Sequence, residues 1–326
     1  MRIAFVGKGG SGKTTITGLF AKYLASKNKK ILVIDADINQ HLGSSLGFED
    51  TKLIDEKTLG NNIDWIKDFF RNRNSLIGSS KEMIKTTPPG EGSRLINLES
   101  KEFFDKFELK NNGIRLLRVG GFSEQDIGTK CYHSKTGTLE LLFNHLIDSK
   151  DDYILVDMTA GADSFASGLF TKFDMTLIVV EPTKKSIDVY KQYKEYAKIH
   201  DLKIVALGNK IYNKEEADYI SYQIGEEPIA KIRSSEYIKK SERGINHGIN
   251  LLEEGNLEAL SKVLKEVDKI EKNWYVHYEL AAKYHEKNAV SWGNDSVGKD
   301  LTKQIDYEFL RNIQKMKGGQ NVISIN

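Results

Sequence analysis

The 326-residue sequence has little cysteine, little proline and no long apolar run. Its single cysteine, Cys131, excludes a disulfide framework within the chain and is typical of a reducing cytoplasm. No apolar run approaches the roughly 20 residues that a membrane-spanning helix needs, and the run over residues 3–6 is too short for a signal peptide. The formal net charge is only +2, so no overall field favours nucleic acid or an acidic membrane. We therefore expect a cytoplasmic globular protein.

What the sequence does contain is a glycine-rich segment at residues 7–15, which reads GKGGSGKTT. It fits the phosphate-loop pattern of a glycine, four residues and then Gly-Lys-Thr. A short apolar run precedes it, and apolar residues at helical spacing follow it, so the segment is predicted to join a strand to a helix. This context favours a phosphate loop over the alternative, a glycine-rich turn with a surface lysine.

The residue types in this segment suit the binding of a triphosphate. Glycines let successive backbone N–H groups point inward without a Cβ in the way, and the helix N-terminus adds partial positive charge. We expect Lys13 to reach the β- and γ-phosphates and the Thr14 hydroxyl to bind Mg²⁺. The expected nucleotide-binding residues of the loop are Gly9, Gly10, Ser11, Gly12, Lys13, Thr14 and Thr15.

Carboxylates follow two other apolar runs that are predicted to be buried parallel strands. Asp35 and Asp37 come at the end of the run over 31–35, and Asp157 ends the run over 153–157. Ligands bind beyond the carboxyl ends of the strands in open parallel sheets. Asp157 is therefore predicted to hold Mg²⁺ through water in a Walker B arrangement, with a simple helix cap as the alternative. For the other two, the alternative is a turn or a cap.

A lysine directly after the first glycine, here Lys8, is not required by a standard phosphate loop. The pattern KGGSGKTT over residues 8–15 resembles the deviant Walker A ATPases, which include the nitrogenase iron protein, MinD, ParA and the CooC-type ATPases. In that family this lysine contacts the phosphates of the partner subunit, so the resemblance implies a nucleotide-dependent homodimer. It also implies that Asp37 orients the attacking water, although Ile38 stands where many members have proline. Asn209, after the run over 203–207, would read the adenine edge, with a turn asparagine as the alternative.

The resemblance to CooC-type ATPases raises the question of a second metal site. Those proteins carry a Cys-x-Cys from which two dimer-related copies bind a metal, and this chain has Cys131, Tyr132 and His133 at the equivalent place. Cys131 and His133 are both good transition-metal ligands. The alternative is a small buried cysteine beside a polar loop histidine. The next helix is expected to have Thr136 or Thr138 as its N-cap.

Strand and helix patterns alternate through residues 1–255, which predicts a three-layer, doubly wound α/β fold with a mainly parallel sheet. An insertion over 48–112 includes the proline-containing loop 86–93, for which a lid and a surface connection are both open. Residues 256–326 form a predicted helical extension that packs on the core or on a dimer partner. A MinD-like membrane tether in this extension is less favoured, because its apolar stripe is narrow.

These observations lead to one functional hypothesis and its rivals. The hypothesis is a Mg²⁺-dependent ATPase that binds ATP and ADP, dimerises, and acts as a switch on an unidentified protein client. A metal-insertion accessory ATPase would use Cys131 and His133. A ParA-like DNA-associated ATPase would need basic patches, and the close lysine pairs of note are 184–185 and 239–240. A small-molecule kinase would share the phosphate loop but usually lacks Lys8.

Overall fold

The computed structural model describes residues 1–48, 56–121, 132–160, 168–200, 202–245 and 247–315. Its centre is an eight-stranded sheet with the order β3-β4-β2-β5-β1-β6-β7-β8. All neighbouring strands are parallel except the hairpin of β3 with β4. The strands are β1 (Arg2–Gly7), β2 (Lys30–Ala36), β3 (Leu109–Asn111), β4 (Ile114–Arg118), β5 (Asp152–Met158), β6 (Met175–Val180), β7 (Ile204–Ile211) and β8 (Ala230–Arg233).

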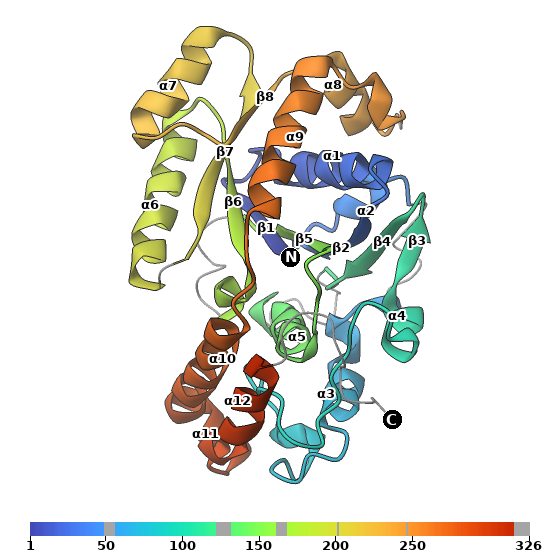
Figure 1. The fold of residues 1–326 in the computed structure, drawn as a ribbon, viewed down its shortest axis with the longest axis vertical. Coiled ribbons are helices and arrows are strands. Elements are labelled where there is room, and N and C mark those ends of the chain that lie inside the picture. The colour runs from blue at the N-terminus through green and yellow to red at the C-terminus, as the bar shows by residue number, and fades with distance from the viewer. Residues whose placement is uncertain (49–55, 122–131, 161–167, 201, 246, 316–326) are drawn as a thin grey trace.

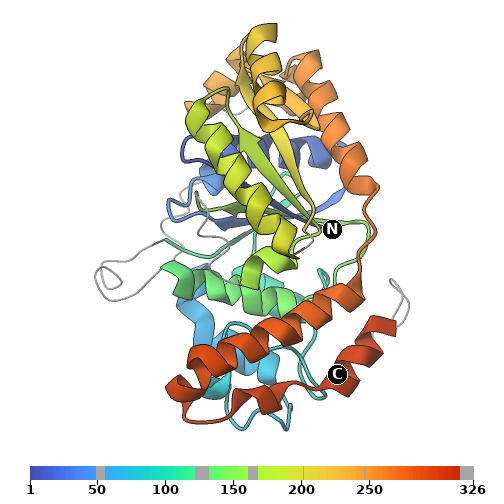
Figure 2. The same ribbon diagram turned by 90° about the vertical axis from the view of Figure 1, so that its left-hand side faces the viewer.

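Helices cover both faces of the sheet, which makes the predicted three layers (Figures 1 and 2). Alternate side chains of each strand enter two different cores, as the period of two requires. In β1, Ile3 and Phe5 face one core and Ala4 and Val6 face the other. The first core is closed by α1 (Lys13–Ser26), α2 (Leu42–Ser45), α8 (Glu236–Glu242) and α9 (Glu254–Asp268). The second is closed by α3 (Ile63–Arg71), α4 (Lys101–Phe107), α5 (Tyr132–His145), α6 (Lys184–His200) and α7 (Lys214–Ile224).

The C-terminal segment divides after α9. This helix buries Leu260, Val263 and Val267 against the core that also contains α1, so it completes a layer of the sheet. The chain then crosses to the far end of the molecule and forms α10 (Trp274–Asn288), α11 (Asn294–Val297) and α12 (Tyr307–Lys315). In the described parts of the chain, no helix has the length and apolar character needed to cross a bilayer.

The insertion and the C-terminal helices pack on each other and on α5 (Figure 2). Ile84 of the insertion shares a small apolar cluster with Ala289 and Leu301. The Thr86 hydroxyl lies 3.2 Å from His285 Nδ1, and Lys299 forms an ion pair with Glu82 at 2.5 Å. Segments about 200 residues apart in the sequence thus build a second lobe beneath the sheet.

The first part of loop 86–93 is neither a lid nor a surface connection, so both sequence-based expectations are wrong for it, whereas Glu91 is exposed. Residues 86–90 are buried between α5 and the C-terminal helices. Backbone carbonyls can be buried there because the Asn144 amide donates to the carbonyl oxygens of Thr86 and Thr87, both at 3.2 Å. Polar partners from α5 replace the water that a surface loop would use.

Several element boundaries also differ from the sequence-based expectation. Helix α5 begins at Tyr132, so Thr136 and Thr138 lie inside it and neither is an N-cap. The Thr138 hydroxyl donates instead to the Lys135 carbonyl at 2.6 Å, a local bond that this residue type commonly makes within helices. Helix α4 and strand β3 were not predicted, and β7 continues past residue 207 to Ile211.

A buried ion cluster joins the sheet to the second lobe. The Asp148 carboxylate is fully buried and accepts from Arg2 Nε at 2.8 Å, from the Met1 amino group at 3.1 Å and from Lys272. Burial alone would raise the pKa of Asp148, but the charges of Arg2, Lys272 and the N-terminal amine outweigh it and hold the pKa well below its ordinary value. The Arg2 guanidinium also lies over the rings of Phe143 and Trp274.

This cluster generates a prediction about stability. Asp148→Asn removes the carboxylate that faces Arg2, the Met1 amine and Lys272, of which Lys272 keeps an ion pair with Asp174 at 3.1 Å, and it should cost about 3–5 kcal/mol of unfolding free energy at pH 7. Because the folded pKa is depressed, the contribution is present above the unfolded pKa of about 3.9 and is lost as the pH falls below it. Urea denaturation from pH 7 to pH 3 should therefore show that the difference in unfolding free energy between wild type and Asp148→Asn becomes smaller at acid pH.

The exposed pair of Lys30 and Glu99 supplies the control, since both side chains are more than half exposed. Glu99→Gln should change stability by less than about 1 kcal/mol at any pH. If the difference in unfolding free energy between wild type and Asp148→Asn stayed constant down to pH 3, Asp148 would not be an ionised carboxylate with a depressed pKa.

Candidate functional site

The glycine-rich segment forms a tight loop between the central strand β1 and helix α1. Strand β1 ends at Gly7, and α1 begins at Lys13. Inside the loop the Ser11 N–H donates to the Lys8 carbonyl at 3.0 Å. Gly10 and Gly12 have φ values of +81° and +92°, a left-handed backbone that favours glycine. The predicted strand–loop–helix context is confirmed, and Lys13, at the first turn of α1, is almost completely buried.

Neighbouring strands press closely on this loop. A Cβ on Gly7 would lie 2.7 Å from the Val179 carbonyl oxygen of β6, and one on Gly12 would lie 2.3 Å from Asn209 Nδ2 of β7. The Asn209 amide donates to the Ser11 carbonyl at 2.8 Å. Asn209, which sequence analysis predicted to read adenine, therefore already contacts the phosphate loop.

The two residues predicted to hold Mg²⁺ lie side by side. The Thr14 hydroxyl donates to Asp157 Oδ2 at 2.6 Å, while Asp157 Oδ1 is buried and has no hydrogen-bond partner among the residues that the structure describes. Burial raises the pKa of Asp157 to about 7, although the Thr14 hydrogen bond and the Lys13 charge act in the opposite direction. A buried carboxylate oxygen without a partner, next to a hydroxyl, fits the oxygen ligands and bound waters of Mg²⁺.

The Asp35 residue of β2 lies beside Asp157, because the two pair in the parallel register of β2 and β5. Asp35 is fully buried and accepts the N–H groups of Asp37 at 3.2 Å and Leu42 at 3.0 Å, so it shapes the loop after β2. Burial and the charge of Asp157 raise the pKa of Asp35 well above its ordinary value. Asp37 Oδ1 accepts from the backbone and side-chain nitrogens of Asn39, at 2.9 and 3.0 Å.

Sequence analysis missed two charged residues at the rim of the loop, Glu181 and Lys210. Lys8 Nζ lies 2.9 Å from the Gly9 carbonyl oxygen and 3.4 Å from Glu181 Oε2. Lys210 Nζ lies 2.8 Å from Glu181 Oε1. Both missed residues lie at the carboxyl ends of strands, the edge already predicted to bind ligand, and that position was the signal available in the sequence.

A bulge in β7 brings Lys210 to this place. The pairing of β7 with β8 shifts register between Gly208 and Ile211, and Lys210 has a left-handed φ of +57°. In a regular strand the side chains of residues 209 and 210 would point to opposite faces. Here Asn209 contacts the Ser11 carbonyl and Lys210 contacts the Gly10 carbonyl at 2.6 Å, so both reach the phosphate loop.

The structure does not describe the side chains of the two predicted transition-metal ligands. Cys131 lies outside the described residues, and His133 is in the first turn of α5 with a side chain that is also outside them. Over the described part of the chain, no group of three or more His, Cys, Asp or Glu side chains is arranged to hold a metal ion. Thr15, predicted to bind nucleotide, has its hydroxyl 3.2 Å from Glu242 Oε1.

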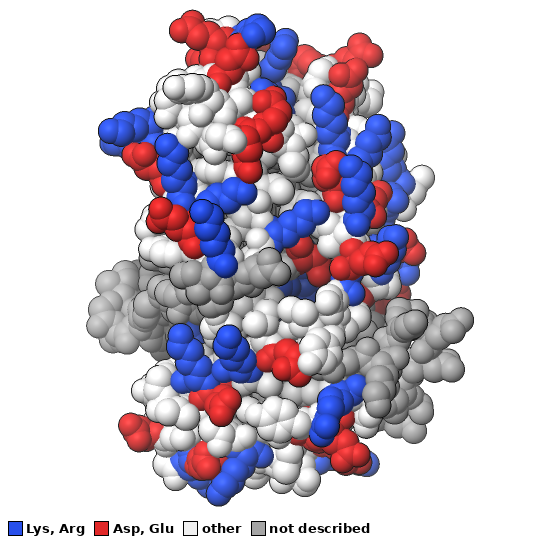
Figure 3. Space-filling view, turned by 60° about the vertical axis from the view of Figure 1, so that its left-hand side comes forward, with Lys and Arg blue, Asp and Glu red and all other residues white. Residues whose placement is uncertain are grey.

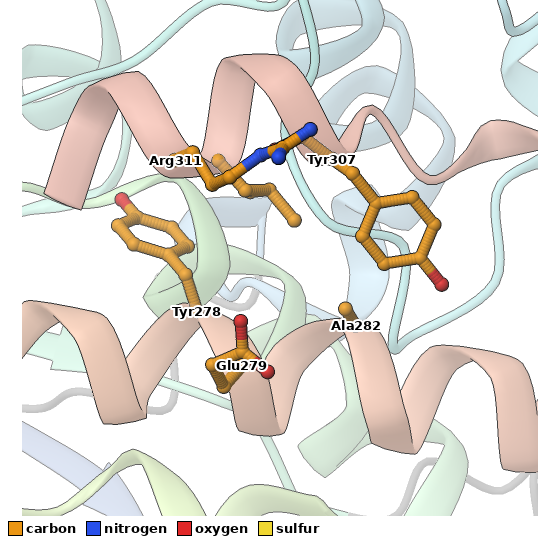
Figure 4. Close-up of a pocket in the computed structure, with 6 residues that line it drawn as sticks. Tyr278, Glu279, Ala282, Tyr307 and Arg311 are labelled. Carbon is orange, nitrogen blue, oxygen red and sulfur yellow. The ribbon is translucent and has the colours of Figure 1, made fainter.

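A separate hollow of about 390 Å³ lies in the second lobe, between α10 and α12 (Figure 4). It is lined by Tyr278, Glu279, Ala282, Tyr307, Leu310 and Arg311. None of these residues belongs to the phosphate loop or to the strand ends around it. This hollow is therefore separate from the glycine-rich loop and from the carboxyl edge of the sheet.

Residues 3–323 match the model of the CobQ/CobB/MinD/ParA nucleotide-binding domain. The chain belongs to this family. It is 31% identical over 278 residues to an uncharacterised ATP-binding protein of Methanocaldococcus jannaschii, a match covering 83% of this chain and 96% of the relative. It is 24% identical over 221 residues to the carbon monoxide dehydrogenase accessory protein CooC of Rhodospirillum rubrum, covering 68% and 78%. The resemblance to MinD, ParA and CooC proteins is thus confirmed.

The fold is similar to that of a solved relative. The septum site-determining protein MinD of Pyrococcus horikoshii, in complex with Mg-ADP, superposes with a TM-score of 0.53 at 18% identity, covering 82% of this chain and 96% of that one. An identity this low supports the fold alone. Family membership makes the chain a nucleotide-binding protein of the MinD/ParA/CooC type.

The close packing of the phosphate loop gives a direct test of nucleotide binding. Gly12→Ala forces a left-handed alanine, at roughly 1–2 kcal/mol, and places its Cβ on the Asn209 amide. We expect the dissociation constant for Mg-ATP, measured by calorimetry, to rise about tenfold or more.

Gly255→Ala is the matched control, because a Cβ at this position in α9 meets no atom within 4 Å. It should leave the affinity for Mg-ATP unchanged and stabilise α9 slightly. Equal affinity in both variants would mean that nucleotide binds elsewhere.

Proposed function

We propose that this protein is a Mg²⁺-dependent ATPase of the deviant Walker A type, working as a dimeric switch on a protein client. The observation that carries the proposal is the pairing of Thr14 with a buried Asp157 that keeps one oxygen unpartnered, directly beside Lys13 and the N-terminus of α1. These groups supply a cation site and an anion site next to each other, which is what a metal–triphosphate needs.

The chain's own groups have distinct tasks in the proposed hydrolysis. Lys13 and the loop N–H groups bind the phosphates and neutralise charge that develops on them. Thr14 and Asp157 would hold Mg²⁺, which would supply positive charge beside the phosphates. Asp37 orients the attacking water, and the two Asn39 hydrogen bonds fix the direction of its carboxylate. Asn209, whose amide donates to the Ser11 carbonyl in this structure, contacts the adenine in the proposed complex.

The proposed dimer is supported by the position of Lys8. Its side chain lies at the rim of the loop and is about one third exposed, so a second subunit could approach it. In the proposed mechanism Lys8 reaches the phosphates bound by the partner subunit, so ATP bridges two copies of the chain. Hydrolysis removes that contact and opens the dimer, and the client senses the difference.

Lys8→Ala tests this mechanism. The variant should fold and bind Mg-ATP nearly as tightly as wild type, but turnover should fall about a hundredfold or more, as for other cations supplied in trans. ATP-dependent dimerisation, followed by analytical ultracentrifugation, should be lost as well. Lys13→Ala is the contrasting variant and should lose nucleotide binding itself. Normal turnover and dimerisation in Lys8→Ala would overturn the trans role.

A second candidate function is supported by the similarity to the carbon monoxide dehydrogenase accessory protein CooC. In that case the dimer would load a metal through Cys131 and His133 of each copy. Elemental analysis of the ATP-bound dimer should then find about one transition-metal ion per dimer, and Cys131→Ser should lose it. Equal metal content in both proteins would remove this candidate.

A DNA-associated function has less support. Figure 3 shows acidic and basic side chains interspersed over the face that it presents. Lys239, one of the closely spaced lysines noted in the sequence, is paired with Glu236 at 2.9 Å. A continuous basic stripe, which would attract a phosphate backbone, is not seen on this face.

A further inference from the structure

The Glu181 carboxylate lies between two lysines that come from different parts of the chain. Its Oε1 accepts from Lys210 at 2.8 Å, and its Oε2 is 3.4 Å from Lys8. Glu181 follows β6 directly, and its N–H donates to the Ser186 hydroxyl at 3.0 Å, which fixes the backbone there. Its side chain is 11% exposed, compared with 32% for Lys8 and 44% for Lys210. The carboxylate is therefore the anchored member of the group.

Each lysine also donates to a carbonyl of the phosphate loop. Lys8 contacts the Gly9 oxygen at 2.9 Å, and Lys210 contacts the Gly10 oxygen at 2.6 Å. Two ammonium groups thus share one carboxylate at the rim of a site built for an anion. The left-handed backbone of Lys210 costs roughly 1–3 kcal/mol in general, and the bulge of β7 maintains it. Strain of this kind indicates that the direction of the side chain matters.

These contacts have a consequence for Lys8, and the consequence rests on the function proposed above. A lysine that acts on the partner's nucleotide is held here against its own subunit. We propose that Glu181 is a positioning residue that keeps Lys8 on its own phosphate loop until a partner-bound triphosphate competes for it, and that Lys210 weakens this hold by sharing the carboxylate.

The geometry is that of a weak ion pair between Lys8 and Glu181, which a competing anion can break easily. The contact of Lys8 with Glu181 is longer than that of Lys210, at 3.4 Å against 2.8 Å. Lys8 is the less exposed of the two lysines, but about one third of its side chain still faces solvent. A partly exposed ion pair is weak and is easily outweighed by a triphosphate with several negative charges. When Lys8 leaves, Lys210 remains paired with Glu181. Its positive charge screens the repulsion between the carboxylate and the incoming phosphates.

The first test measures the hold itself, in the nucleotide-free protein. Brief acylation with an N-hydroxysuccinimide ester, read at each lysine by mass spectrometry, reports how free the Lys8 amine is. Glu181→Gln should increase the rate at Lys8 about two- to fivefold, the range expected for one such ion pair. Lys210→Met gives Lys8 the whole carboxylate and should slow the rate. An unchanged rate at Lys8 in Glu181→Gln overturns the proposal.

The second test measures the effect on assembly. The protein concentration at half-dimerisation, with a non-hydrolysable ATP analogue and Mg²⁺, should fall about two- to fivefold in Glu181→Gln and rise in Lys210→Met. A structural defect would shift both variants in the same direction. An unchanged midpoint in Glu181→Gln overturns the positioning role even if its labelling rate rises.

Glu242→Gln is the matched control for general electrostatics. Glu242 is exposed, contacts Thr15 at the end of the same loop, and has no hydrogen bond to Lys8. Its loss removes the same charge near the site but should leave the labelling rate at Lys8 unchanged. Failure of the proposed function looks different: wild type would bind Mg-ATP and stay monomeric, while the labelling shift in Glu181→Gln would still be seen.

Discussion

The burial of two neighbouring carboxyl groups at one edge of the sheet is the constraint on which the rest of the structure depends. The parallel register places Asp35 and Asp157 on adjacent strands, and both carboxylates are removed from water. Burying charges in this way is costly, so cations and N–H donors must face them. Asp35 accepts hydrogen bonds from backbone N–H groups, whereas Asp157 keeps a buried oxygen that no described residue contacts by a hydrogen bond. The phosphate loop completes this arrangement, because the Thr14 hydroxyl and the charge of Lys13 both act on Asp157.

Much of this edge could be predicted from the sequence because its signals are local. A strand that is buried on both faces is a continuous apolar run, and the loop after β1 has a fixed spacing of glycine and lysine. Thr14 and Asp157 were predicted to share a cation, and they are in contact. Those predictions needed only the rule that carboxyl ends of parallel strands meet at one edge.

Other features could not be predicted because they depend on contacts between distant segments. Residues 86–90 have the composition of an exposed loop, yet Asn144 of α5 satisfies their carbonyls and the C-terminal helices cover them. Glu181 and Lys210 are marked in the sequence only by their position at the ends of strands, and their contact at 2.8 Å is seen only in the structure, where the pairing of β7 is irregular. The start of α5 was misplaced for a related reason, since a threonine inside a helix and a capping threonine look alike in sequence.

The bulge in β7 has a further consequence for how this protein can change over evolutionary time. It couples two neighbouring side chains that a regular strand would separate, so the asparagine and the lysine at 209 and 210 serve one loop together. Loss of a single residue between 208 and 211 would restore alternation and turn one of them away. Point substitutions at 209 or 210 can alter one contact with the phosphate loop at a time, whereas an insertion or deletion there would separate the two contacts in one step.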